Sequence, residues 1–242
     1  MIPKLSSNPT EHSFVFRANE ETLSAVGITR QPEDRYDMIS LHGAGESTKE
    51  RQLYLLKEIC ERTPFSVLSF DFSGHGKSTG SLSGSSLQKR TSEALVAFQL
   101  YGKPKGVLFG SSMGAYIALK LLSECQPHTL VLFCPAVYSR DSFAVPFGPQ
   151  FSAAIRRPES WRDTDILEQL GRYSGRLLIF MGEGDQVIPR GIIELLDETA
   201  IRAEKKKIVW IPNCPHAIHL FLPAHDEARE KVVSEIEAFL AE

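Results

Sequence analysis

Residues 106–122 read GVLFGSSMGAYIALKLL, and this stretch decides how the rest of the chain is interpreted. Its apolar start predicts a buried strand and its apolar end, 115–122, predicts a helix, which leaves a sharp turn between them. The turn carries the pattern G-x-S-x-G, with Ser112 at its centre and Gly110 and Gly114 on either side. Such a turn strains the backbone of its serine, and glycines at the flanking positions avoid collisions with neighbouring backbone. We therefore predict that Ser112 is a nucleophile at a helix N-terminus, where developing negative charge is favoured.

A second G-x-S-x-G match lies at residues 76–80, around Ser78. It continues into GSLSG, which cannot form a buried helix, so we favour Ser112 as the nucleophile. The same GKS triplet resembles part of a phosphate-binding P-loop, but that motif needs a glycine where this chain has Asp71. For Ser112 itself, the alternative is a glycine-flanked serine in an inert turn.

Strand-like and helix-like segments alternate on both sides of the Ser112 turn. Strands are predicted at 14–16, 23–27, 38–41, 66–70, 106–109, 129–133, 176–180 and 207–211, the first two forming a hairpin. Helices are predicted at 51–60, 91–101, 115–122, 192–199 and 226–240. This alternation predicts an α/β fold with a mostly parallel central sheet of about eight strands and helices on both faces. In such sheets, ligands bind beyond the carboxyl ends of the strands.

Two segments interrupt this alternation within what we expect to be a single domain, residues 1–242. Residues 74–86 are rich in Gly and Ser and predict a loop. Residues 136–174 are longer than one helical connection needs and carry several aromatic residues, among them Tyr138, Phe143, Phe147, Phe151 and Trp161. We expect a small lid inserted over the active site. The alternative is a surface crossover whose aromatic side chains pack on the main core.

A base and an acid are predicted from residues that follow the last two strands. His216 comes just past strand 207–211, and Asp185 lies in a glycine-rich turn after strand 176–180. A carboxylate there can hold the imidazole in the productive tautomer for a serine nucleophile. His219 and Glu183 are the competing candidates for base and acid.

The turn His42-Gly43-Ala44-Gly45 directly follows strand 38–41. A glycine-rich turn at the carboxyl end of a strand can aim backbone N–H groups outward, and acyl transfer needs two such donors for its oxyanion. We assign the N–H groups of Ala44 and Met113, with Gly45 as the fallback for Ala44. The alternative is a plain turn, and we do not expect His42 to transfer protons.

Composition excludes several classes of function. The 27 basic and 30 acidic residues give a net charge of −3, which offers no electrostatic footprint for nucleic acid or an anionic membrane. The four cysteines form no CxxC pair, so neither a metal site nor a redox motif is predicted. No stretch has the apolar length of a signal peptide core or a membrane span. We therefore expect a cytoplasmic protein whose partner is a small molecule.

With these motifs in place, the chain resembles the α/β-hydrolase superfamily over nearly its whole length. The match includes residues 71–78, DFSGHGKS, which look like the mainly structural D-x-x-G-H-G-x-S segment of that superfamily. The resemblance implies a Ser-Asp-His triad and no cofactor, and Ser112 argues against the dehalogenase and epoxide-hydrolase branches. The shortness of the lid segment favours small to medium acyl groups. Cys214 departs from the Gly or Ser often found there, and is a candidate for lining the pocket.

These observations predict a serine hydrolase that cleaves an ester or thioester through an acyl-enzyme intermediate. Two alternatives stay open. A peptidase or amidase could use the same triad, with acidic lid residues to bind a substrate amine. These are Asp141, Glu159, Asp163 and Asp165. A non-catalytic binding protein on the same fold is the other alternative, because fold does not determine function.

Overall fold

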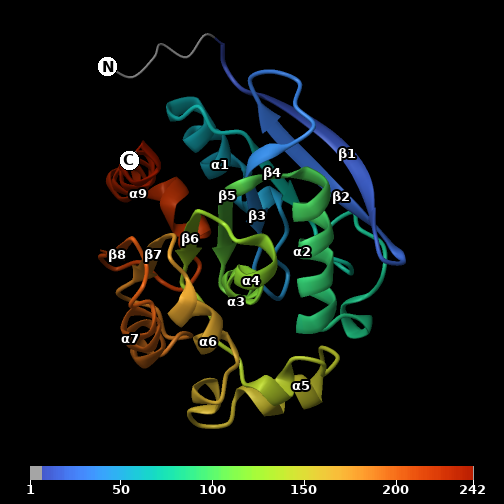
Figure 1. Ribbon diagram of the computed structural model, residues 1–242, viewed down its shortest axis with the longest axis vertical. Helices are drawn as coiled ribbons and strands as arrows, with labels where there is room; N and C mark the ends of the chain where they lie inside the picture. Colours follow the sequence, from blue (N-terminus) through green and yellow to red (C-terminus); the bar gives the residue numbers. More distant parts are fainter. Residues whose placement is uncertain (1–6, 242) are drawn as a thin grey trace.

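The computed structural model describes residues 7–241, and a single eight-stranded sheet forms its centre in the order β1-β2-β4-β3-β5-β6-β7-β8 (Figure 1). The strands are β1 (Thr10–Ala18), β2 (Glu21–Thr29), β3 (Tyr36–Leu41), β4 (Val67–Phe70), β5 (Gly102–Ser111), β6 (Thr129–Phe133), β7 (Arg176–Gly182) and β8 (Lys205–Ile211). The hairpin β1–β2 is antiparallel and β2 joins β4 antiparallel, whereas every pairing from β4 to β8 is parallel. The predicted fold class, with its mostly parallel sheet, is confirmed.

Helices cover both faces of the sheet. The longer ones are α1 (Glu50–Arg62), α2 (Leu87–Tyr101), α3 (Met113–Lys120), α7 (Arg190–Thr199) and α9 (Asp226–Ala241), and the shorter ones are α4 (Leu122–Cys125), α5 (Pro149–Ile155), α6 (Ile166–Arg172) and α8 (Ile218–Phe221). Helix α1 packs with α8 and α9, while α2, α3, α4 and α6 contact one another as a second group. Burial on both faces explains why every residue of β4, β6 and β7 is buried.

The parallel register brings the carboxyl ends of the central strands to one edge of the sheet. Leu41 of β3 pairs with Gly110 of β5, and Ser111 of β5 pairs with Phe133 of β6. The loops that leave β3, β5, β7 and β8 therefore meet at this edge, which is where side chains from distant parts of the sequence can combine.

Most predicted elements are present, with shifts at their ends. The helix predicted at 115–122 begins earlier, at Met113, and stops at Lys120, after which α4 starts a new turn. The helix predicted at 91–101 begins at Leu87, where Ser86 caps it through its side chain. The loop predicted at 74–86 contains one short 3₁₀ turn, η1 (Leu82–Gly84).

The connection between β6 and β7 contains α5, α6 and the 3₁₀ turns η2 (Arg140–Ser142) and η3 (Ser160–Arg162). Figure 1 places α5 at one end of the molecule, beyond α2 and α6. Aromatic side chains of this β6–β7 connection pack on the helices that cover the sheet: the ring centroids of Tyr138, in the connection, and Tyr116, in α3, are 5.1 Å apart. Phe147 and Phe151 stack edge to face at 4.9 Å. Within residues 7–241, no helix is long and apolar enough to cross a bilayer.

Candidate active site

Ser112 occupies the sharp turn between β5 and α3. Its backbone has φ 52° and ψ −112°, a conformation that L-residues rarely adopt outside strained sites. Each flanking glycine lies against a different stretch of neighbouring backbone. A Cβ on Gly110 would lie 2.6 Å from the Cα of Ala115, and one on Gly114 would lie 2.2 Å from the carbonyl oxygen of Leu41. Both positions therefore exclude side chains because backbone approaches too closely.

Ser112, His216 and Asp185 form one hydrogen-bonded line. The Ser112 Oγ lies 3.0 Å from the His216 Nε2, and the His216 Nδ1 lies 2.8 Å from the Asp185 Oδ2. These residues come from the loops after β5, β8 and β7 in turn. The structure thus brings together the three residues that the sequence analysis selected.

Backbone contacts hold the two loops that carry the acid and the base. The Gly184 N–H donates to the Cys214 carbonyl at 2.9 Å, which joins the loop after β7 to the loop after β8. The Asp185 Oδ1 accepts hydrogen bonds from the N–H groups of Val187 at 2.7 Å and Ile188 at 3.0 Å. The second oxygen is therefore the one left to face His216.

The environment keeps Asp185 ionised. Burial by itself would raise the pKa of this carboxyl, whose side chain is 1% exposed. Hydrogen bonds from His216, Val187 and Ile188 outweigh that effect and hold the pKa below its ordinary value. An ionised carboxylate accepts a hydrogen bond from His216 Nδ1–H and so holds the proton on that nitrogen, which leaves the Nε2 lone pair facing the Ser112 hydroxyl.

The competing candidates lie elsewhere. The His219 Nε2 has no hydrogen-bond partner among residues 7–241, and burial, with Arg51 nearby, lowers the pKa of this imidazole to about 4. Glu183 is exposed. Ser78 is used structurally: its hydroxyl donates to the Asp71 carbonyl at 2.6 Å and accepts from the Ser24 N–H at 2.9 Å. The second G-x-S-x-G match is therefore a structural turn.

The loop after β3 lies directly against Ser112. A Cβ on Gly43 would come within 3.5 Å of the Ser112 Cβ. The Gly43 carbonyl accepts hydrogen bonds from His42 Nδ1 at 2.8 Å and from Arg90 Nη1 at 3.3 Å. Because the peptide is trans, the Ala44 N–H points away from both donors. In the described part of the chain neither this N–H nor that of Met113 has an acceptor, so both are available to a ligand.

Two contacts attach this loop to the segment that resembles D-x-x-G-H-G-x-S. The Lys49 ammonium, 2% exposed, lies 2.6 Å from the Asp71 Oδ2, and the Lys49 N–H donates to Oδ1 at 2.8 Å. The His75 Nδ1 donates to the Ser47 carbonyl, 2.9 Å away. The role of Lys49 could not be predicted from the sequence, because nothing in its local pattern marks this lysine as buried.

His42 is held as a neutral imidazole beneath the same loop. Burial, followed by the nearby Arg90, lowers its pKa well below the ordinary value. Its Nδ1–H donates to Gly43 and its Nε2 accepts the Phe72 N–H at 3.1 Å, so neither nitrogen is free for proton transfer. This agrees with the expectation that His42 has no part in the chemistry.

A cavity of about 550 Å³ lies beside the two free N–H groups. Its walls come from the loop after β3, α2, α3 and residues of the two segments 74–86 and 136–174. The lining residues are Ala44, Gly45, Leu82, Ser83, Arg90, Met113, Phe147, Gly148, Phe151 and Ser152. Cys214 is absent from this lining, and its thiol contacts the Pro215 carbonyl instead, so the expectation that it lines the pocket is wrong.

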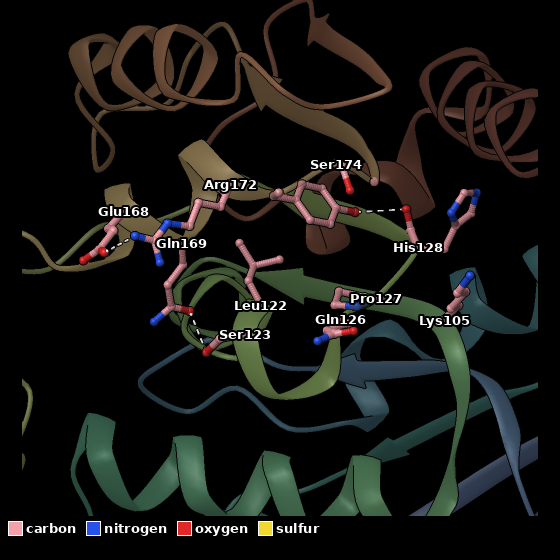
Figure 2. A pocket seen from close by; sticks show the side chains of 12 residues that line it. Lys105, Leu122, Ser123, Gln126, Pro127, His128, Glu168, Gln169, Arg172 and Ser174 are labelled. Atoms are coloured by element: carbon pink, nitrogen blue, oxygen red, sulfur yellow. Dashed lines mark hydrogen bonds and ion pairs between the residues drawn. The ribbon is translucent and has the colours of Figure 1, made fainter.

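A groove of about 630 Å³, whose lining side chains Figure 2 shows, lies at the amino ends of β6 and β7, because His128 and Gly175 directly precede these strands. It includes Lys105 and His128, which precede the parallel parts of β5 and β6, and Arg172, which is ion-paired with Glu168 at 2.8 Å. Ligands of parallel sheets bind at the carboxyl ends, so this groove is not the candidate site.

One group of possible metal ligands occurs within the described residues: the sulfur of Cys134, an oxygen of Asp185 and a nitrogen of His216 lie within 4.8 Å of one another. Asp185 and His216 already bond to each other. Burial raises the pKa of the Cys134 thiol, so it stays protonated. A protonated thiol and an imidazole already bonded to the carboxylate are poor metal ligands, so Asp185 and His216 are assigned to the hydrogen-bonded line with Ser112 and not to a metal site.

Comparisons with known proteins agree with this geometry. A family model described as serine aminopeptidase, S33, matches residues 32–159. Among solved structures, the chain is similar to a predicted CIB-like hydrolase from Thermoplasma acidophilum, at TM-score 0.71 and 14% identity over 95% of this chain and 99% of that one. An esterase from Pyrococcus furiosus gives TM-score 0.69 and 19% identity over 96% and 92% of the two chains.

A thioesterase domain from the curacin biosynthetic pathway gives TM-score 0.67 and 13% identity, covering 94% of this chain and 99% of that one. No curated protein matches the chain. At these identities the structural likeness shows the fold alone. The family model, however, spans more than half of the sequence and includes Ser112 and the turn 42–45. The chain therefore belongs to the serine aminopeptidase S33 family, and it is an α/β-hydrolase enzyme.

Proposed function

We propose that this protein hydrolyses an ester or thioester of a small to medium acyl group, with Ser112 as nucleophile, His216 as base and Asp185 as the orienting acid. The observation that carries the proposal is the continuous line from Ser112 Oγ through the imidazole to the Asp185 carboxylate, with both contacts at 3.0 Å or less. The Ser112–His216 contact is short enough for proton transfer, and the His216–Asp185 contact is short enough to orient the imidazole.

In the proposed reaction, Ser112 Oγ attacks the acyl carbon while His216 Nε2 takes the hydroxyl proton. The carbonyl oxygen becomes an oxyanion, which the N–H groups of Ala44 and Met113 stabilise. Collapse expels the alcohol or thiol, which receives the proton from His216, and leaves an acyl-enzyme. A water molecule then attacks the acyl-enzyme while His216 takes one of its protons. Collapse of the second tetrahedral intermediate releases the carboxylic acid, and His216 returns the proton to the Ser112 Oγ. Each step needs only groups of the chain, substrate and water.

The acyl-size preference rests on the cavity. Its volume of about 550 Å³ lies in the range of small-molecule sites. Phe147 and Phe151, from the segment between β6 and β7, close one side of it. We therefore propose that residues 136–174 act as a lid within a single catalytic domain, and that the rings limit acyl length.

The family description makes an aminopeptidase the second candidate. Such an enzyme needs free carboxylates to bind the substrate amine. The acidic residues of the lid segment are each paired with a cation: Asp141 with Arg157, Glu159 with Arg162, Asp163 with Arg140, Asp165 with Lys120 and Glu168 with Arg172. None of them lines the cavity beside Ser112. These pairings favour the acyl-ester reaction.

The test is labelling by an alkyl phosphonate probe combined with a chain-length series of nitrophenyl esters, acyl thioesters and aminoacyl anilides. We expect stoichiometric labelling that is lost in Ser112→Ala but retained in Ser78→Ala, the matched control from the second motif. Turnover of short esters, without anilide cleavage, supports the proposal. A folded wild-type protein that never labels would refute it, and preferential anilide cleavage would favour the peptidase.

A further inference from the structure

Arg90, on the first turn of α2, carries a buried charge that no role proposed so far uses. Its side chain is fully buried, and in the part of the chain that the structure describes it forms no ion pair with a carboxylate. Its guanidinium lies between two aromatic rings, 5.1 Å from the centroid of Phe72 and 4.7 Å from that of Phe147. Its Nε has no hydrogen-bond partner among residues 7–241.

The charge on Arg90 persists at neutral pH. Burial lowers the pKa of the guanidinium to about 10, which still leaves it protonated. Its neighbour His75 accepts a hydrogen bond from Arg90 Nη2 but brings no negative charge, because burial and then Arg90 itself lower the pKa of that imidazole to about 4 and keep it neutral. The nearby Glu93 binds the Ser73 N–H at 3.1 Å instead, and burial raises its pKa. An unpaired buried cation is costly, which suggests that an anion is present in some state of the enzyme.

The contacts of Arg90 lead to the oxyanion site. Its Nη1 donates to the Gly43 carbonyl at 3.3 Å and lies 3.1 Å from the Met113 Sδ. Gly43 contributes the carbonyl of the peptide whose other end is the Ala44 N–H. Met113 contributes the second N–H. One guanidinium, on a fully buried side chain at the inner wall of the cavity, therefore contacts both the Gly43–Ala44 peptide and Met113, which supply the proposed donors.

We propose that Arg90 is a positioning residue for the oxyanion hole. Its hydrogen bond fixes the Gly43–Ala44 peptide with the Ala44 N–H directed away from α2, and its charge polarises that peptide, which makes the N–H a stronger donor. The inference rests on the acyl-transfer function proposed above. A full negative charge exists at this site only in the tetrahedral state, so Arg90 stabilises the transition state more than the bound substrate.

The test compares two variants. Arg90→Met keeps much of the side-chain length but removes the positive charge, and Arg90→Lys keeps the charge but removes the planar set of guanidinium N–H donors. Lys89→Met is the matched control, because it removes one positive charge from the next position of α2, where Lys89 pairs with Glu21 near the surface. Each variant is checked by melting temperature and phosphonate labelling. The measurements are kcat and KM for a short ester and Ki for an alkyl boronic acid, which places a tetrahedral oxyanion mimic in the hole.

Losing one direct oxyanion donor lowers kcat about 100- to 1,000-fold; Arg90 acts through the donors, so we expect about a 10- to 100-fold loss in Arg90→Met. KM should stay within about twofold, and Ki for the boronate should rise by the same factor as kcat falls. Arg90→Lys should lie between wild type and Arg90→Met on both measures. Lys89→Met should match wild type.

The central result is that kcat and boronate affinity change together in every variant that folds, and Arg90→Lys provides this comparison even when Arg90→Met does not fold. A variant with unchanged boronate affinity, or with a raised KM in place of a lowered kcat, overturns the inference and leaves Arg90 a packing residue. A wild-type protein that neither labels nor turns over esters refutes the proposed function instead. The two failures are therefore distinguishable.

Discussion

Replacing Asp185 by Asn tests whether the carboxylate sets the tautomer of His216. The amide keeps the shape but has one acceptor oxygen and one NH₂ group. Two backbone N–H groups, from Val187 and Ile188, face one side of this residue, and a single imidazole nitrogen faces the other. Satisfying two donors outweighs satisfying one, so the oxygen should face the backbone and the NH₂ should face His216.

An NH₂ group at that position donates to Nδ1 and moves the imidazole proton to Nε2. His216 then presents N–H to the Ser112 hydroxyl, 3.0 Å away, and cannot accept its proton. The loss of the productive tautomer in a Ser-His-Asp site costs about 10⁴ in kcat, or about 5.4 kcal/mol of barrier. The assay is kcat with a nitrophenyl ester, together with the rate of phosphonate labelling.

Glu183→Gln is the control for this change, because it neutralises an exposed carboxylate in the same turn. It should leave kcat within about twofold of wild type, since exposed charges interact weakly through water. A folded Asp185→Asn protein that retains kcat within tenfold of wild type would refute the tautomer argument. Equal losses of kcat in both variants would mean that the conformation of the turn, and not the Asp185 carboxylate, determines activity.

Asp185 also makes stability depend on pH. Its hydrogen bonds hold its pKa below the ordinary value of 3.8 despite burial, so the folded protein binds a proton here less readily than the unfolded chain. This contribution is present above the unfolded-state pKa and is lost as the pH falls through the lower folded-state pKa. Melting temperatures measured from neutral to acidic pH should therefore fall less in Asp185→Asn than in wild type, and an equal fall contradicts the assignment.

Three further substitutions test the supporting structure. Gly114→Ala places a methyl group 2.2 Å from the Leu41 carbonyl oxygen, so we expect the free energy of unfolding, measured with urea, to fall by about 1–3 kcal/mol. An unchanged free energy of unfolding would contradict that close contact. Lys49→Met leaves the buried Asp71 carboxylate unpaired and should cost about 3–5 kcal/mol in the same assay, whereas a loss below 1 kcal/mol would show that the pair is dispensable. Phe147→Ala enlarges the cavity and should move the preferred ester to longer acyl chains, and an unchanged chain-length profile would separate this ring from the acyl site.

Sequence alone was sufficient for the alternation of strands and helices and for the choice of Ser112 over Ser78. Both depend on local patterns: a buried strand and a helix flank one G-x-S-x-G match, while a glycine- and serine-rich loop follows the other. It also selected Asp185 and His216, because each follows a strong strand and the carboxyl ends of parallel strands share an edge. The suggestion that Cys214 lines the pocket came instead from the resemblance to the superfamily, and it was wrong because the thiol is fully buried against the Pro215 carbonyl.

Contacts between distant residues could be found only in the folded chain. The pairing of Lys49 with Asp71 depends on the neighbouring positions of β3 and β4, and no local period marks either side chain as buried. Arg90 was missed because its helix was predicted to begin at residue 91, whereas Ser86 starts it earlier and brings the guanidinium under the loop after β3. Local propensity and hydrophobic period specify which elements form and what their ends carry. Which charges become buried beside them depends on packing between elements, and only the tertiary structure determines that.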